Sequence, residues 1–279
     1  MADKQNTYHS QDNIRDDTQD NTMENTPENF TSDTTHFGYS EVPINEKRNR
    51  VRGVFESVAR NYDLMNDLMS GGIHRLWKTS LIDWLNPRAG EAHLDVAGGT
   101  GDIALRVIDQ VGRELAGPVT VCDLTPDMML VGRDRAIDQG IVQGISWTCG
   151  NAESLPFPDR SMNSYTIAFG LRNVTHIDKA LSEARRVLKP GGRFFCLEFS
   201  QVVLPVLSEI YDQYSFKILP TMGQLIANDR ESYQYLAESI RRFPPQDDLI
   251  RMMTAAGFEQ CSYRNYTGGV AAIHCGWRI

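Results

Sequence analysis

The stretch His93-Leu-Asp-Val-Ala-Gly-Gly-Thr-Gly-Asp102 decides the fold of this 279-residue chain. His93–Ala97 is a short apolar run, which is typical of a buried strand. Gly98–Gly101 allows a tight turn, and the periodic apolar residues from Asp102 to about Val111 predict a helix. A strand, a glycine turn and a helix in this order are typical of an α/β unit that holds a ligand at the helix N-terminus.

The same alternation continues toward the C-terminus. Pro190-Gly191-Gly192 ends the last helix of the series, as a Gly/Pro stop signal does. A helix and two β runs joined by Gly268-Gly269 then predict an antiparallel hairpin. The order of elements predicts an α/β fold with a doubly wound, mostly parallel sheet. We expect strands at Val119–Asp123, Ile145–Cys149, Ser164–Phe169, Arg193–Phe199, Phe258–Tyr266 and Val270–Trp277, and helices at Pro126–Gln139, Lys179–Leu188 and Asp247–Ala256.

The chain divides into a tail and a single domain. Residues 1–36 are rich in Asn, Asp, Thr and Gln and poor in aliphatic residues, which predicts a disordered acidic tail. Residues 37–279 form the domain. Its expected parts are a helical lead-in that acts as an N-terminal lid (43–85), a ligand-binding core (91–199), a lid insertion (200–243) and a C-terminal helix with the hairpin (246–279).

Composition and charge exclude several classes of protein. The net charge is −8, but residues 1–36 carry eight acids and two basic residues, so the rest carries only −2. There is no basic stripe of the kind that binds a phosphate backbone, which argues against a nucleic-acid partner. The five cysteines are scattered singly, which argues against a disulfide framework or a zinc ribbon. No apolar run approaches the roughly 18–20 residues that span a bilayer.

The glycine turn by itself leaves the ligand open. Gly99-x-Gly101-x-x-Ala104 also satisfies the loose fingerprint of dinucleotide-binding enzymes. An acid, Asp95, lies inside the preceding strand, where it disfavours a pyrophosphate. A second acid, Asp123, ends the next strand at about the spacing expected for a ribose diol. This arrangement favours a nucleoside with a cationic tail, such as S-adenosylmethionine (SAM), over NAD.

Several blocks of the sequence resemble one family. Asp95–Asp102, Gly150–Asp159 and Leu188–Gly192 are similar to the motifs of class I SAM-dependent methyltransferases, which have a Rossmann-like fold. Two longer blocks, Tyr62–Trp77 and Arg186–Ser200, resemble signatures of the ubiquinone/menaquinone biosynthesis C-methyltransferase family. Shorter matching stretches are Phe169–Val174, Ala227–Asp229 and Tyr233–Ile240.

The resemblance implies an activity and a cofactor site. Members of the family transfer a methyl group from SAM to a ring carbon of a polyprenylated quinol, either 2-polyprenyl-6-methoxy-1,4-benzoquinol or demethylmenaquinol, and the sequence leaves both acceptors open. The resemblance also implies that Thr100 contacts SAM from the glycine turn, that Asp123 binds the ribose, and that Asn151 and Ala152 lie beside the adenine. No metal is expected, because methyl transfer to an activated carbon needs none.

The resemblance places Arg172, Asn173 and Tyr62 on the acceptor side as catalytic residues. Arg172 and Asn173 follow a strand end, where ligands lie in open α/β sheets. Since arginine stays protonated, we expect Arg172 to hold a water molecule or the developing phenolate oxygen while Asn173 orients it. Tyr62 and His74 would close the pocket. The alternatives are a surface ion pair for Arg172, lid or core packing for Tyr62, and a packed, hydrogen-bonded helix position for His74.

The prenyl tail of such a substrate needs an apolar groove. Val202–Leu207 and Tyr214–Leu219 are apolar and aromatic, and we expect a lid there that contacts the tail, the alternative being ordinary packing over the sheet. We therefore expect a cytoplasmic enzyme that contacts the inner face of the membrane peripherally, as a homodimer or in a quinone-biosynthesis complex. Three other functions stay open: methylation of another small apolar acceptor, a dehydrogenase, and a non-enzymatic binding module.

Overall fold

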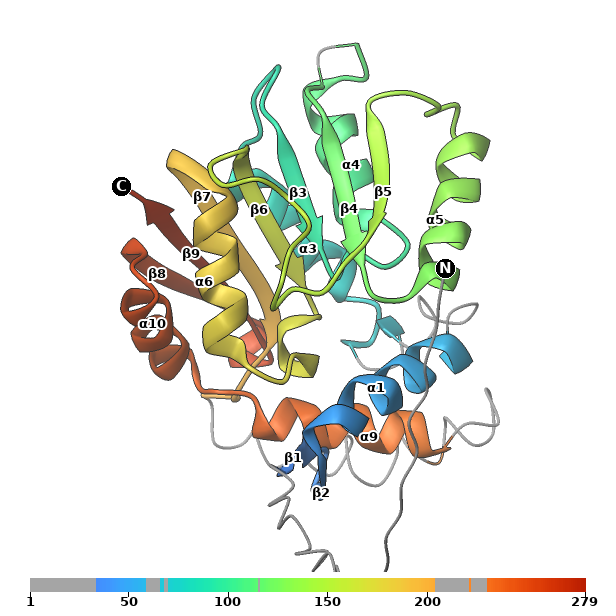
Figure 1. Cartoon of the computed structure of the whole chain (residues 1–279), viewed down its shortest axis with the longest axis vertical. Helices are drawn as coiled ribbons and strands as arrows, with labels where there is room; N and C mark the ends of the chain where they lie inside the picture. Colours follow the sequence, from blue (N-terminus) through green and yellow to red (C-terminus); the bar gives the residue numbers. More distant parts are fainter. Residues whose placement is uncertain (1–33, 59–65, 68–69, 115, 204–220, 222–229) are drawn as a thin grey trace, which may run out of the picture. The chain divides into compact units, whose positions relative to one another are not determined.

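The computed structural model, which describes residues 34–58, 66–67, 70–114, 116–203, 221 and 230–279, places a central sheet between two layers of helices (Figure 1). Within these residues the sheet has seven strands in the order β5-β4-β3-β6-β7-β9-β8. Strands β3 to β7 pair in parallel, whereas β9 pairs antiparallel with both β7 and β8. The predicted sheet and its C-terminal hairpin are confirmed. The strands are β3 (His93–Val96), β4 (Val119–Asp123), β5 (Ile145–Cys149), β6 (Met162–Ala168), β7 (Leu188–Phe199), β8 (Glu259–Tyr266) and β9 (Ala271–Arg278).

The chain winds outward from β3 in both directions. Strands β4 and β5 follow on one side of β3, and β6 and β7 follow on the other, so the strand order reverses between β3 and β6. In open α/β sheets, ligands bind beyond the carboxyl ends of the strands at such a reversal. The topology therefore places the expected site at the ends of β3, β4 and β6.

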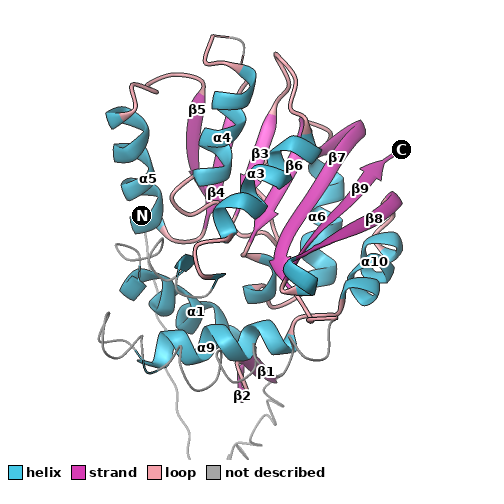
Figure 2. Cartoon of the chain, turned by 180° about the vertical axis from the view of Figure 1, so that it is seen from behind, coloured by secondary structure: helices cyan, strands magenta, loops and turns pink. Residues whose placement is uncertain are grey.

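Helices cover both faces of the sheet (Figure 2). Buried apolar side chains of α3 (His74–Leu85) and α4 (Asp102–Val111), together with Ala136 of α5 (Pro126–Asp138), join one apolar cluster. Those of α6 (Ile177–Val187) and α10 (Gln246–Ala255) join the other. Two 3₁₀ turns, η2 (Leu171–Asn173) and η5 (Thr267–Gly269), follow β6 and β8.

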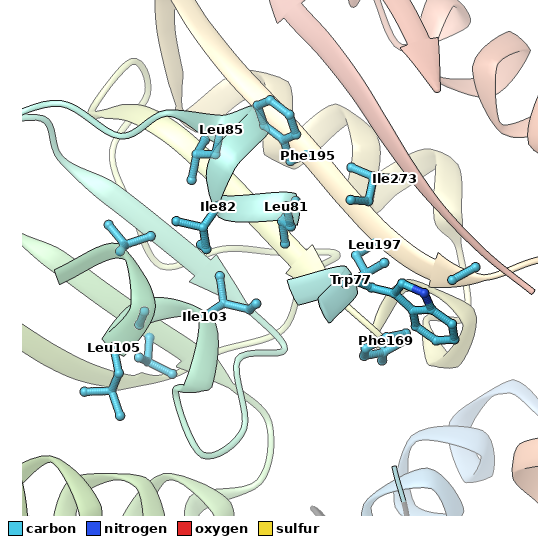
Figure 3. Close-up of a cluster of buried hydrophobic side chains, with 14 of the residues drawn as sticks. Trp77, Leu81, Ile82, Leu85, Ile103, Leu105, Phe169, Phe195, Leu197 and Ile273 are labelled. Atoms are coloured by element: carbon cyan, nitrogen blue, oxygen red, sulfur yellow. The ribbon is translucent and has the colours of Figure 1, made fainter. Parts of the chain in front are cut away.

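Helix α3 shows how sequence periodicity produces the packing. Trp77, Leu81 and Leu85 recur at four-residue spacing and are at most 2% exposed. They belong to the same cluster as Phe195 and Phe199 of β7 (Figure 3). Trp77 meets Phe199 edge-on, with 5.9 Å between ring centroids. Burying a side chain of this size contributes about 1.5–3 kcal/mol to stability, so this face fixes β7 firmly beneath α3.

A second group of elements lies beyond the carboxyl ends of the parallel strands (Figure 1). It comprises β1 (Thr34–Phe37), β2 (Ser40–Pro43), α1 (Ile44–Val58) and α9 (Arg230–Arg242). The rings of Phe37 and Tyr235 stack with 4.2 Å between centroids, and the N–H of Tyr39 donates to Glu238 Oε2 at 2.9 Å. These contacts fasten the β1–β2 hairpin to α9.

Two predicted boundaries are wrong. Residues 34–36, which the sequence assigned to the disordered tail of residues 1–36, belong to β1, and β1 pairs with β2. Strand β7 begins at Leu188 rather than Arg193. Leu188 pairs with Met162 and Arg193 pairs with Ser164, so the Lys189–Gly192 segment bulges between two paired positions instead of separating helix from strand.

Several predictions fall on parts of the chain outside the described residues. They concern Tyr62, the tail up to residue 33, and the lid from 204 to 220. The described residues from Thr34 to Ile279 belong to one compact unit. Among the described helices, none combines the length and apolarity needed to cross a membrane.

Candidate active site

A cavity lies at the reversal of the sheet, with about 850 Å³ of empty space that is partly open to solvent. Its walls come from the carboxyl ends of β3, β4, β5 and β6 and from α1. The residues that line it are Arg48, Val51, Arg52, Phe55, Val96, Ala97, Gly99, Asp123, Leu124, Thr125, Met128, Gly150, Asn151, Ala152, Glu153, Phe169, Gly170, Asn173, Val174 and Thr175.

The glycine turn forms the wall next to β3. Gly99 lines the cavity and donates its N–H to Asp123 Oδ2 at 2.9 Å. Gly101 has a φ of 73°, and a Cβ there would stand 2.6 Å from the ring of Trp147, so only glycine fits without strain. Thr100 is 3% exposed and is not among the lining residues, so contact between its side chain and SAM stays a prediction.

Asp123 ends β4 and faces the cavity. Its two carboxylate oxygens accept one backbone N–H each, Oδ2 from Gly99 and Oδ1 from Thr125 at 2.8 Å. These bonds hold the carboxylate in one orientation, while burial raises its pKa. A fixed carboxylate with lone pairs to spare suits the two hydroxyls of a ribose, as the sequence predicted.

Asn151 and Ala152 lie in the loop after β5, and both line the cavity. Asn151 Oδ1 accepts the N–H of Glu153 at 3.0 Å. Glu153 Oε1 in turn accepts the N–H of Thr175 at 3.0 Å, which ties this loop to the one after β6. The structure thus brings Asp123, Asn151 and Ala152 together around one cavity.

Asp95 lies buried behind the glycine turn, and its carboxyl group bears on which ligand can bind there. Its Oδ1 accepts the hydroxyl of Thr166 at 2.9 Å, whereas Oδ2 has no hydrogen-bond partner among the described residues. That oxygen stands 2.8 Å from where a Cβ on Gly98 would be. Burial raises the pKa of Asp95 to about 7. One oxygen of this buried carboxyl therefore lacks a partner beside the glycine turn, which disfavours a pyrophosphate there, and the residues present fit SAM.

The predicted acceptor residues occupy η2, directly after β6. Asn173 lines the cavity. Arg172 does not line it, because its side chain is fully buried against Glu198 of β7, with Nη1 3.0 Å from Oε2. Nη1 also donates to the carbonyl of Phe169 at 2.6 Å. Arg172 thus forms a buried ion pair and not the surface ion pair of the alternative, and its contact with the acceptor stays a prediction.

Helix α1 forms a wall of the cavity that the sequence did not predict. Arg48, Val51, Arg52 and Phe55 all line the cavity, and their i, i+3, i+4, i+7 spacing places them on one face of the helix. Lys47 anchors this helix, since Nζ donates to the carbonyl of Val174 at 3.1 Å. Two arginines within an otherwise apolar stripe were a signal that this face meets a polar ligand.

His74 lies at the start of α3 and is not among the lining residues. Its Nε2 is 2.9 Å from Asp67 Oδ1, and burial lowers its pKa. The packed, hydrogen-bonded alternative for His74 is therefore confirmed. In the described part of the chain, no group of three or more His, Cys, Asp or Glu side chains is arranged to hold a metal ion.

Comparison with known proteins identifies the family. Residues 43–278 match the model of the ubiE/COQ5 methyltransferase family. A relative from Brucella suis biovar 1, named ubiquinone/menaquinone biosynthesis C-methyltransferase UbiE, is 56% identical over 245 residues, which cover 87% of this chain and 90% of the relative. A relative of the same name from Brucella anthropi is 55% identical over 87% of this chain and 92% of its own length.

Solved structures share the fold at lower identity. A SAM-dependent methyltransferase from Thermotoga maritima aligns with a TM-score of 0.59 and 19% identity, covering 82% of this chain and all of that one. The SAM-bound phosphoethanolamine N-methyltransferase 2 of Haemonchus contortus aligns with a TM-score of 0.53 and 15% identity, over 72% of this chain and 52% of that one. The sheet is therefore that of class I SAM-dependent methyltransferases, and the chain belongs to the ubiE/COQ5 methyltransferase family.

Proposed function

We propose that this chain methylates a ring carbon of a polyprenylated quinol, with SAM as the methyl donor, in ubiquinone or menaquinone biosynthesis. The name of the Brucella relatives supports this assignment, because the match to them covers 87% of the chain. The structural observation that supports it most is the continuity of the cavity. One space reaches from Asp123 and Asn151, where a nucleoside fits, to Phe169 and Asn173, where an acceptor ring would lie.

The reaction makes a clear demand on the protein. A ring carbon is a weak nucleophile until a neighbouring hydroxyl loses its proton, or nearly so, and spreads negative charge into the ring. When bound, SAM supplies an electrophilic methyl group and retains the electron pair of the broken C–S bond. The ring carbon uses its own electron pair for the new C–C bond and then loses its proton to water, which restores the aromatic ring.

Different residues of the cavity bind the nucleoside and orient the acceptor. Asp123, Asn151 and Ala152 hold the nucleoside, and holding both reactants in line is worth up to about 7–11 kcal/mol of the barrier. Asn173 donates a hydrogen bond to the acceptor oxygen from the cavity wall. Arg172 lies behind that wall in a buried ion pair with Glu198, so it acts on the acceptor through the position of η2, which carries Asn173. Tyr62, for which the sequence predicts a role on the acceptor side, lies outside the described part of the chain.

A gene-deletion strain tests the proposal. Its lipid extract should accumulate a demethylated quinone, and the ring that accumulates distinguishes a benzoquinol from a naphthoquinol acceptor. Expression of the wild-type chain should remove this intermediate, whereas the Asp123→Ala variant should not. A deletion strain with an unchanged quinone profile would favour a different small apolar acceptor.

We further propose that the chain is cytoplasmic and contacts the inner face of the membrane peripherally. The apolar side chains of Ile73, Leu76 and Val203 are 37%, 67% and 56% exposed. Their segments meet at η5, because Trp77 Nε1 donates to Thr267 Oγ1 and the N–H of Val203 donates to the carbonyl of Gly268.

Flotation with liposomes that carry the quinol substrate measures this contact. The chain should rise with the vesicles, and a Leu76→Ser, Val203→Ser variant should rise less. A chain that never associates with them contradicts membrane contact. The mass of the particle in solution decides between a homodimer and a quinone-biosynthesis complex.

A further inference from the structure

Helix α9 places Tyr235 beside the acceptor half of the cavity, the part lined by Phe169 and Asn173. The hydroxyl of Tyr235 donates to Asn173 Oδ1 at 3.1 Å. Tyr235 is 4% exposed and does not line the cavity, whereas Asn173 does. The Tyr235 side chain therefore reaches the site through Asn173.

Two contacts orient the Asn173 amide: the Tyr235 hydroxyl on its oxygen, and the Phe169 carbonyl, which can only accept, near its nitrogen. The oxygen is turned toward Tyr235, and Nδ2 lies 3.5 Å from the carbonyl of Phe169. That carbonyl already accepts Arg172 Nη1 at 2.6 Å, so its bond to Nδ2 is the long and weak one. An amide nitrogen carries two N–H groups, so one remains available to a ligand in the cavity that Asn173 lines.

The surroundings of Tyr235 keep its hydroxyl protonated and its ring in place. Its ring stacks on Phe37 with 4.2 Å between centroids and 16° between planes. Burial raises the pKa of its hydroxyl, and the charged groups that act on it are Arg172 and Glu198, which are paired with each other. The hydroxyl therefore keeps its proton, and the stacked ring holds it in place.

We propose that Tyr235 is a positioning residue that fixes the Asn173 amide with its nitrogen toward the acceptor hydroxyl. This inference rests on the proposed function, since it concerns the oxygen whose negative charge activates the ring carbon. With the amide turned over, the carbonyl oxygen would face a developing phenolate and repel it. With the amide held as observed, an N–H meets that charge without reorganisation at the moment of reaction.

The Tyr235→Phe variant tests this role, because it removes the donor and keeps the ring that stacks on Phe37. We expect kcat to fall about tenfold, as the loss of one hydrogen bond to a charged group predicts. We also expect the acid limb of the kcat–pH profile to move to higher pH, since the phenolate loses stabilisation. The affinity for SAM, measured by calorimetry, should not change.

Two further variants keep the test specific. Tyr263→Phe, on β8 at the far edge of the sheet, removes a tyrosine hydroxyl outside the cavity and should leave kcat and the pH profile unchanged. The Tyr235→Phe, Asn173→Ala double variant should be no slower than Asn173→Ala alone, because Tyr235 acts through Asn173.

The outcomes separate the inference from the proposed function. A Tyr235→Phe variant with wild-type kcat and pH profile overturns the positioning role. So does one that loses SAM affinity and melting temperature together with activity, since that marks a purely structural role. A wild-type chain that methylates neither quinol overturns the proposed function itself.

Discussion

Arg172 and Glu198 form an ion pair in which neither side chain exposes any surface, with Nη1 3.0 Å from Oε2. Glu198 Oε1 also accepts the backbone N–H of Arg172 at 3.1 Å. The pair therefore fastens η2, which carries Asn173, to the neighbouring strand β7. Burial raises the pKa of Glu198, and the charge of Arg172 opposes that shift.

Breaking this pair should destabilise the protein. The Glu198→Gln variant leaves the guanidinium of Arg172 buried without a counter-charge, and such losses typically cost about 3–5 kcal/mol. Urea denaturation measures the free energy of unfolding. A loss below about 1 kcal/mol would contradict the structural role of the pair.

Replacing both partners separates that structural role from an effect on catalysis. An Arg172→Met, Glu198→Leu variant removes both buried charges, and apolar replacements of this kind are often neutral for stability. We expect a smaller loss of unfolding free energy than in Glu198→Gln, because the N–H groups that Glu198 accepts, and not a buried charge, are left without a partner, with unchanged SAM affinity and a kcat at least tenfold lower. Full activity in the stable double variant would show that the pair does not position η2 and Asn173 for the acceptor.

Asp123 should dominate nucleoside binding. Asp123→Ala removes the carboxylate that both Gly99 and Thr125 hold in place, and we expect the Kd for SAM to rise about 10–100-fold. Titration calorimetry measures it. Asp134→Ala is the matched control, because Asp134 is an exposed acid of α5 that does not line the cavity. Equal SAM affinities of the two variants would show that Asp123 does not bind SAM.

Asp95 should make stability depend on pH in a predictable direction. Its pKa in the folded chain is about 7, above the ordinary value of 3.8, because burial disfavours the charged form. The folded chain therefore binds the proton more tightly than the unfolded one, and stability from this group is lost as pH rises from about 4 to 7.

The Asp95→Asn variant isolates this effect, because asparagine keeps the oxygen that accepts the Thr166 hydroxyl. Without SAM, the variant should be more stable than the wild type at pH 8, by an amount on the order of a few kcal/mol at most. At pH 4 the difference should nearly vanish. Thermal melts at both pH values measure it, and an equal difference at the two would mean that Asp95 does not titrate in this range.

Lys47 should control how firmly α1 covers the cavity. Lys47→Met keeps the apolar stem but loses the hydrogen bond to the Val174 carbonyl. We expect SAM to dissociate several-fold faster, because α1 carries four of the lining residues. Stopped-flow displacement measures the rate, with Lys179→Met on the exposed side of α6 as control. Unchanged dissociation would show that α1 is held by its other contacts.

The parts of the fold that followed from sequence have strong local signals. Helix α4 and strand β5 have the predicted bounds, because apolar periodicity and flanking glycines agree there. The β1–β2 hairpin was missed because Thr34–Phe37 follows a polar tail and gains its order from pairing and from the stack on Tyr235. At Lys189–Gly192, pairing on both flanks overrides the Gly/Pro signal.

The residues predicted to bind SAM could also be placed at one cavity from the sequence. Asp123, Asn151 and Ala152 follow strand ends, and parallel strands bring such ends together at one edge of the sheet. Arg48 and Arg52 were not predicted as lining residues, since their place depends on how α1 crosses that edge. Glu198 carried a signal that was not used: an acid within the apolar run of β7 needs a buried partner.

The central claim is methyl transfer to carbon, and isotope labelling tests it most directly. The purified chain is incubated with SAM that carries a ¹³C-labelled methyl group and with each demethylated quinol in turn, and the extracted product is analysed by NMR and mass spectrometry. The account predicts one labelled methyl group per molecule, attached to a ring carbon, and its absence with Asp123→Ala. A label on oxygen, or no transfer to either quinol, would contradict it.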